Sequence, residues 1–164
     1  MIVNFSPDEI LKIAEQMERN GNSFYSSAAK SSTRQITRDL LNRLADMEVE
    51  HEKVFAGMRN KLLSLGESTS VYDPEDHAIL YLQAWADGQV FDEKGNLTEQ
   101  LIGNIDIEEI LQTAIGLEKD SILFYIGMKE MITEERGRSE IDVIINEEMK
   151  HIALLSSELR SLRS

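Results

Sequence analysis

The chain has 164 residues, a length typical of one domain with one hydrophobic core, and its 41% apolar and 29% charged residues exclude wholesale disorder. Its formal net charge of −13 disfavours a nucleic-acid or anionic-membrane partner, because phosphate groups are bound by clustered Lys and Arg side chains. No cysteine is present, so disulfides, iron-sulfur clusters and thiolate zinc sites are excluded, and any metal must be bound through oxygen and imidazole.

The first predicted helix spans residues 7–31 and begins at a capping box, in which Ser6 caps the first turn, Pro7 takes the first helical position and Glu9 follows. Apolar residues recur along it every three or four positions, which predicts one buried stripe. The second predicted helix spans residues 33–65 and carries a similar apolar stripe that includes Ile36.

A long connection separates the second helix from the third. It contains a short predicted helix at 74–87, and it is long enough to cross from one end of a bundle to the other. The third helix is predicted at 107–132, after the cap residue Asp106, and the fourth at 139–162. Strand signals are nearly absent. The sequence therefore predicts an all-α fold over residues 1–164, a single-domain antiparallel four-helix bundle with a long helical crossover between the second and third helices.

An internal repeat relates the two halves of the chain. The first predicted helix corresponds to the third, and the second corresponds to the fourth. Apolar matches are expected between any two amphipathic helices, so the polar matches carry the information. Residues of the first half recur, without gaps, in the second half: Glu18 as Glu118, Tyr25 as Tyr125, Glu48 as Glu148 and His51 as His151.

Helical geometry turns these repeated acids toward the apolar stripe. At about 100° of rotation per residue, positions four or seven apart share a face. Glu18 follows Ala14 by four residues, and Glu48 follows Leu44 by four. His51 precedes Phe55 by four. Because the repeat places the corresponding residues of the second half in the same way, four carboxylates and two imidazoles are predicted to point into one core.

Such a cluster of acids requires positive charge. Each ionised carboxylate would face a desolvation penalty of several kcal/mol, and the inward positions carry no Lys or Arg. Two divalent ions would neutralise four carboxylates, and two neutral imidazoles complete a ligand set that suits iron or manganese. In each Glu-x-x-His pair the two side chains lie about one helical turn apart, so the carboxylate can bridge two metals while the His binds one.

These residues resemble the rubrerythrin branch of the ferritin-like di-iron carboxylate proteins. The resemblance implies a ferritin-like bundle and a centre of two iron ions, with manganese as the alternative metal. It also implies that the hydroxyls of Tyr25 and Tyr125 orient ligand carboxylates across the bundle. Carried onto this chain, the family pattern implies terminal carboxylates at Glu18 and Glu118, bridging carboxylates at Glu48 and Glu148, and one imidazole for each iron from His51 and His151.

The sequence departs from the family pattern in two respects. Members that reduce peroxide usually carry an additional Glu one turn after the ligand of the third helix, where this chain has Ser121, and the matching position of the first helix is Gly21. Without cysteine, these residues cannot form the rubredoxin-type iron centre either. The resemblance therefore implies an external redox protein as electron donor, and it also implies a homodimer.

The leading functional hypothesis is a non-haem di-iron redox protein that reacts with hydrogen peroxide or dioxygen in oxidative-stress defence. One alternative is a ferroxidase that oxidises ferrous iron for detoxification or storage, and another is a non-catalytic, metal-stabilised scaffold. No run of about 18 apolar residues occurs, so a cytoplasmic protein is expected. His77 and the acids Glu15, Glu50, Glu52 and Glu147 are assigned to the surface or to the edge of the stripe. Core packing is assigned to Met17, Met47, Met58, Met128 and Met149.

Overall fold

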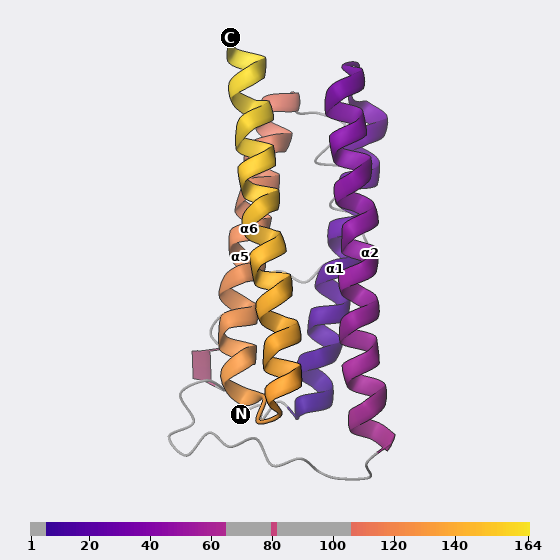
Figure 1. The fold of residues 1–164 in the computed structure, drawn as a ribbon. Helices are drawn as coiled ribbons and strands as arrows, with labels where there is room; N and C mark the ends of the chain where they lie inside the picture. The colour runs from indigo at the N-terminus through magenta and orange to yellow at the C-terminus, as the bar shows by residue number, and fades with distance from the viewer. Residues whose placement is uncertain (1–5, 65–79, 82–105) are drawn as a thin grey trace.

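The computed structural model describes residues 6–64, 80–81 and 106–164. Its four long helices are α1 (Pro7–Ser31), α2 (Gln35–Ser64), α5 (Ile107–Met131) and α6 (Glu135–Arg163). Figure 1 shows them side by side along one axis, with α1 and α2 forming one pair and α5 and α6 the other. The structure thus confirms the predicted all-α four-helix bundle. None of the described helices is long and apolar enough to cross a membrane.

Neighbouring helices run in opposite directions. Arg59 near the end of α2 donates to Asp8 at the start of α1 at 2.6 Å, and Arg163 at the end of α6 donates to Glu108 at the start of α5 at 2.8 Å. Packing is closest within each pair, while α1 also meets α5 and α2 also meets α6. Helices α2 and α5 both run downward in Figure 1, so the end of α2 and the start of α5 lie at opposite ends of the bundle.

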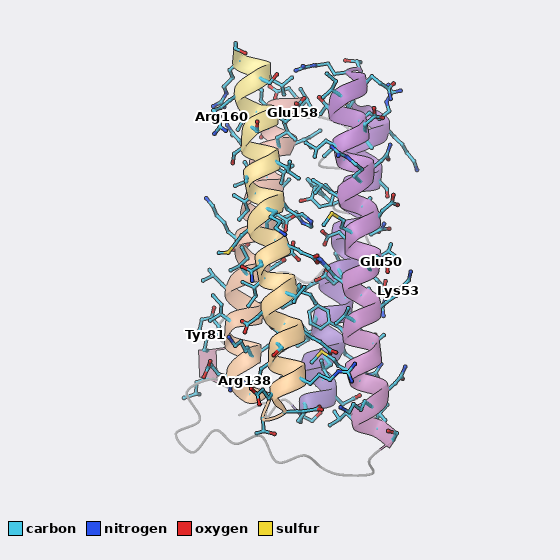
Figure 2. All side chains as sticks on the ribbon, in the orientation of Figure 1. Glu50, Lys53, Tyr81, Arg138, Glu158 and Arg160 are labelled. Carbon is cyan, nitrogen blue, oxygen red and sulfur yellow. The ribbon has the colours of Figure 1, made fainter. Side chains whose placement is uncertain are left out.

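Most helix boundaries agree with the pattern-based prediction to within two residues, but the predicted start of the fourth helix was wrong. Helix α6 begins at Glu135 instead of residue 139. The added turn, residues 135–138, forms although it contains Gly137, a poor helix former, and an Arg136–Glu140 ion pair at 3.2 Å joins it to the next turn. The predicted short helix at 74–87 lies outside the described residues apart from 80–81, where the Tyr81 hydroxyl donates to the Leu123 carbonyl of α5 at 2.6 Å. Figure 2 shows Tyr81 beside α5.

The buried core consists of two apolar clusters. One includes Tyr25 and Leu41, and the other includes Phe55 and Tyr125. Each of the four helices contributes to both clusters, and between its two contributions it carries one of the repeated acids. A polar layer therefore crosses the middle of the bundle with apolar packing on both sides, which isolates it from bulk water.

Three expectations about burial were wrong. Ile36 is 66% exposed, because its neighbour Thr37 takes the inward position and donates to Glu158. Met149 is 52% exposed, since it follows the inward-facing Glu148 by one residue and is rotated by about 100°. Glu15 is buried instead of solvated, and it lies 3.0 Å from Arg19.

Candidate metal centre

The six predicted ligands meet in the polar layer as two overlapping groups. Glu18, Glu48, His51 and Glu148 offer one ligand atom each within 4.8 Å of one another, and Glu48, Glu118, Glu148 and His151 do the same. The two groups share Glu48 and Glu148. Each group adds one further carboxylate and one imidazole, so the arrangement has two potential metal positions that share two carboxylates. Every one of the six side chains is buried.

The two imidazoles face the carboxylates with the same nitrogen. His51 Nδ1 lies 3.1 Å from Glu148 Oε1, and His151 Nδ1 lies 2.9 Å from Glu148 Oε2. The rings are stacked with centroids 5.7 Å apart. Because each Nδ1 points toward the shared carboxylates, both rings present a donor atom to the region between the helices.

Two tyrosines tie the halves of the repeat together. The Tyr25 hydroxyl of α1 donates a hydrogen bond to Glu118 of α5, and the Tyr125 hydroxyl of α5 donates one to Glu18 of α1. Burial and the neighbouring carboxylates raise the pKa of both hydroxyls well above the usual value, so both remain protonated donors. The carboxylates of Glu18 and Glu118 are thus each oriented by a tyrosine from the other half.

Burial and neighbouring charges shift the pKa values of the clustered carboxylates in opposite directions. Burial, together with the charges of Glu148 and Glu18, raises the pKa of Glu48 well above its usual range. Burial also raises the pKa of Glu118 to about 8, against the lowering influence of His151. Burial acts in the same direction on Glu148, but the two nearby histidines outweigh it and hold the pKa of that carboxyl well below its usual range.

Both histidines are stabilised in their protonated form when no metal is bound. Burial opposes this charge, but the adjacent carboxylates of Glu148 and Glu18 raise the pKa of His51 to about 11. The carboxylates of Glu118 and Glu148 raise the pKa of His151 to about 9 in the same way. In the metal-free protein, protons on the imidazoles and carboxyls therefore balance the negative charge of the cluster. A dication would have to displace these protons.

The residues present suit a pair of metal ions. Among the residues that the structure describes, seven buried side-chain atoms of the cluster have no hydrogen-bond partner, and they belong to Glu18, Glu48, His51, Glu148 and His151. Several of them lie at ion-pair distance without hydrogen-bond alignment, as His51 Nδ1 and Glu148 Oε1 do. Unpartnered buried polar atoms are costly and rare, and these belong to five neighbouring side chains of one layer. Their oxygen and imidazole chemistry is that of iron and manganese sites.

Gly21 leaves room for the shared carboxylate of Glu48. A Cβ atom added at this position would come within 2.6 Å of Glu48 Oε2. The absence of a side chain in α1 therefore allows Glu48 to reach its place in the layer. Sequence reasoning identified position 21 only as lacking a carboxylate and did not find this close approach.

The substitution Gly21→Ala is expected to weaken divalent metal binding by roughly 10- to 100-fold, because the added methyl group displaces Glu48. The matched control is Gly116→Ala, where an added Cβ meets nothing within 4 Å. That control should bind metal normally and gain about 0.5–1 kcal/mol of stability from the removal of a mid-helix glycine. Calorimetric metal titration with thermal unfolding measures both effects. Unchanged metal affinity in Gly21→Ala would contradict this role for the glycine.

Glu147 was assigned to the surface or the edge of the stripe, yet it contacts the cluster. Its Oε2 lies 2.8 Å from His51 Nε2, and its side chain is 34% exposed. The repeat offered a signal for this, since the corresponding residue is Met47, so this position differs between halves that otherwise share their ligands.

Comparisons of the sequence and the structure with known proteins identify the family of this chain. The sequence model of the family described as Rubrerythrin matches residues 9–159, which include all six clustered residues. The chain belongs to the rubrerythrin family. An uncharacterized protein of Archaeoglobus fulgidus is 39% identical over 56 residues, covering 34% of this chain and 87% of that protein. A Thermotoga maritima structure titled as a ferritin-like diiron-carboxylate protein superposes with a TM-score of 0.69 at 20% identity, covering 96% of each chain.

These comparisons extend the structural result. The rubrerythrin match covers all four helices, and the structural similarity confirms a ferritin-like bundle. The buried Glu and His groups form a candidate metal site within this family's fold. The assignment of individual ligands, the number of ions and their identity remain predictions.

Proposed function

We propose that this rubrerythrin-family chain is a non-haem di-iron redox protein that reacts with hydrogen peroxide or dioxygen in oxidative-stress defence. The observation that carries the proposal is the pair of buried Glu and His groups that share Glu48 and Glu148. Two carboxylates common to both positions would hold two ions close together, which is the arrangement that two-metal chemistry requires.

The proposed ligands divide as the sequence pattern implies. Glu18 and His51 would complete one position, and Glu118 and His151 would complete the other. Two ferrous ions held there would together supply the two electrons that convert one hydrogen peroxide and two protons into two waters. The chain itself contributes burial, which excludes bulk water, and the hydroxyls of Tyr25 and Tyr125, which keep the terminal carboxylates oriented.

Rereduction requires electrons from outside these residues. They contain no cysteine with which to hold a rubredoxin-type iron, so we assign this task to an external redox protein. We also propose a cytoplasmic homodimer, which sedimentation of the purified protein would test. Ser121 takes the place of the additional family carboxylate, so the expected peroxide reaction relies on the six clustered ligands alone.

The reaction can be tested on anaerobic protein loaded with two equivalents of ferrous iron. Mixing with one equivalent of hydrogen peroxide, or with dioxygen, should produce the absorbance of an oxo-bridged diferric centre, and a reductant should reverse it. Gly116→Ala should behave like the wild type, whereas His51→Ala should produce no such absorbance. Oxidation no faster than that of free ferrous iron would contradict the proposal and favour a metal-stabilised scaffold. Continued consumption of excess ferrous iron with mineral formation would instead identify a ferroxidase.

A further inference from the structure

The two imidazoles of the cluster differ in their outer contacts. His51 Nε2 lies 2.8 Å from Glu147 Oε2. His151 Nε2 is buried and has no hydrogen-bond partner within the part of the chain that the structure describes. The internal repeat explains the difference, because the position that corresponds to Glu147 in the other half is Met47. The six clustered side chains repeat between the two halves of the chain, but the residues that contact the outer nitrogens of the two imidazoles do not.

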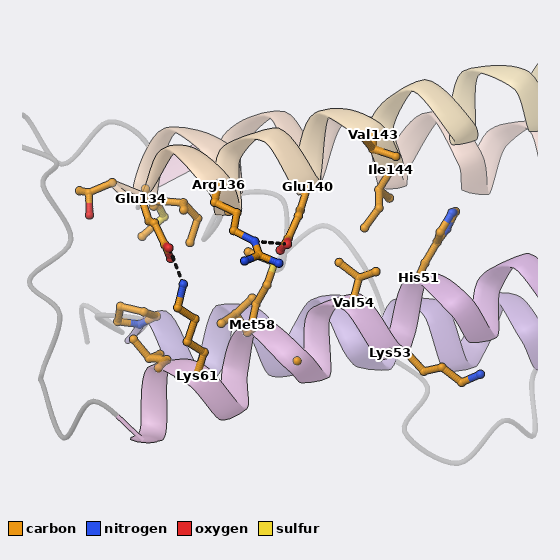
Figure 3. A pocket seen from close by; sticks show the side chains of 18 of the residues that line it. His51, Lys53, Val54, Met58, Lys61, Glu134, Arg136, Glu140, Val143 and Ile144 are labelled. Carbon is orange, nitrogen blue, oxygen red and sulfur yellow. Dashed lines mark hydrogen bonds and ion pairs between the residues drawn. The ribbon is translucent and has the colours of Figure 1, made fainter.

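The same asymmetry appears in access to solvent. A groove of about 940 Å³ between α2 and α6 is lined by His51 and Glu147, with Val54, Met58 and Ile144 among its apolar residues. Figure 3 shows His51 at one end of this groove, pointing from α2 toward α6. His151 is not among the residues that line this groove. The half of the centre that contains His51 therefore borders this groove, although the His51 side chain itself is buried.

The contact with Glu147 prepares His51 as a ligand. An ionised carboxylate only accepts hydrogen bonds, so His51 Nε2 is the donor, and in the neutral ring Nδ1 then carries the lone pair. This Nδ1 faces Glu148 and Glu18 at 3.1 and 3.5 Å. A carboxylate on the outer nitrogen fixes the tautomer and raises the basicity of the inner one, and loss of such a partner typically weakens metal binding by about 10- to 100-fold.

We propose that the two metal positions are inequivalent, and that the position of Glu18 and His51 binds a divalent cation first and more tightly because Glu147 positions His51. This inference rests on the proposed dinuclear centre. Glu147 is a positioning residue, since it acts through His51 and is not counted among the ligands. The position of Glu118 and His151 lacks this support and fills second.

Anaerobic titration with Mn²⁺, followed by calorimetry and electron paramagnetic resonance, tests the order of filling without any enzymatic turnover. The wild type should bind in two steps separated by roughly 10- to 100-fold in affinity. At one equivalent the spectrum should be that of isolated Mn²⁺, and the signal of a coupled pair should grow only toward two equivalents.

Variants at the two repeat-related positions give opposite expectations. Glu147→Leu should weaken the tighter step by about 10- to 100-fold, so that the two steps merge. Met47→Glu, which supplies the missing carboxylate, should strengthen the weaker step. Glu140→Gln is the matched control, because Glu140 also lines the groove and carries the same charge but pairs with Arg136. Its two binding steps should be those of the wild type. Circular dichroism verifies that each variant is folded.

A double-variant cycle assigns the step to a residue. In a His51→Ala background the tighter step should be absent and Glu147→Leu should have no further effect, whereas His151→Ala should keep the tighter step. If Glu147→Leu binds two ions with the affinities of the wild type, this inference is overturned and the proposed dinuclear centre is not. A persistent effect of Glu147→Leu without His51 would also overturn it. Wild-type protein that binds no Mn²⁺ and no Fe²⁺ would overturn the dinuclear centre as well.

Discussion

Glu48→Gln should abolish the stabilisation of this protein by divalent metal while leaving the metal-free form at least as stable as the wild type. In the wild type, free metal at 100 times the dissociation constant should add about 2.7 kcal/mol per site, which for two sites corresponds to a melting-temperature increase of roughly 10–20 °C. Glu48 belongs to both ligand groups, so its loss affects both positions. Without metal, the neutral amide replaces a carboxyl whose charged form is disfavoured by burial and by its acidic neighbours.

Glu148→Gln provides the contrasting control for this experiment. Glu148 is also shared by both groups, so metal-dependent stabilisation should again be lost. The metal-free form should be destabilised, however, because the ionised Glu148 lies between His51 and His151 and stabilises the protonated form of both. Thermal unfolding with and without Mn²⁺ measures both effects. Equal behaviour of the two metal-free variants would contradict the electrostatic assignment of the shared carboxylates.

Metal-free protein should lose stability as the pH rises from about 5 to about 9. The folded-state pKa of Glu118 is raised to about 8 from 4.5, so its contribution is present below pH 4.5 and is lost as the pH passes through 8. The pKa values of His151 and His51 are raised from 6.5 to about 9 and about 11, so their contribution is complete below pH 6.5 and is also lost with rising pH. Both kinds of group therefore act in the same direction.

Bound metal should reverse this dependence. Ligand carboxylates and imidazoles must release their protons to bind a cation, so metal affinity increases with pH and binding releases protons. The gap in melting temperature between loaded and metal-free protein should widen from pH 5 to pH 8. Melting curves at several pH values, with Glu48→Gln as the variant that cannot respond to metal, measure this gap. A gap that narrows with pH would contradict proton displacement from the cluster.

The fold and the members of the cluster could be predicted because their signals are local or repeated. Helix periodicity and the Ser6 capping box define α1 to the residue, and the capping box is present in the structure. The Glu-x-x-His spacing places Glu48 with His51 on one face of a single helix, and the repeat applies the same geometry to the other half. Such features depend on the distance along one helix, which sequence gives directly.

The remaining features depend on how separate helices approach one another. The contact of Glu147 with His51 crosses from α6 to α2, and the close approach of Gly21 to Glu48 crosses from α1 to α2. Helical periodicity assigns a residue to a face, but it does not determine which residue at the edge of that face meets a neighbouring helix. The early start of α6 at Glu135 has another cause, because no side-chain cap marks this end.

The most direct test of the metal centre is an anomalous difference map from crystals of iron-loaded protein, recorded at the iron absorption edge. Two peaks, separated by about 3.5–4 Å, should lie between Glu48 and Glu148, with His51 next to one and His151 next to the other. A map without peaks in the polar layer at saturating iron, with its carboxylates still buried, would show that protons alone sustain the cluster and would contradict the account.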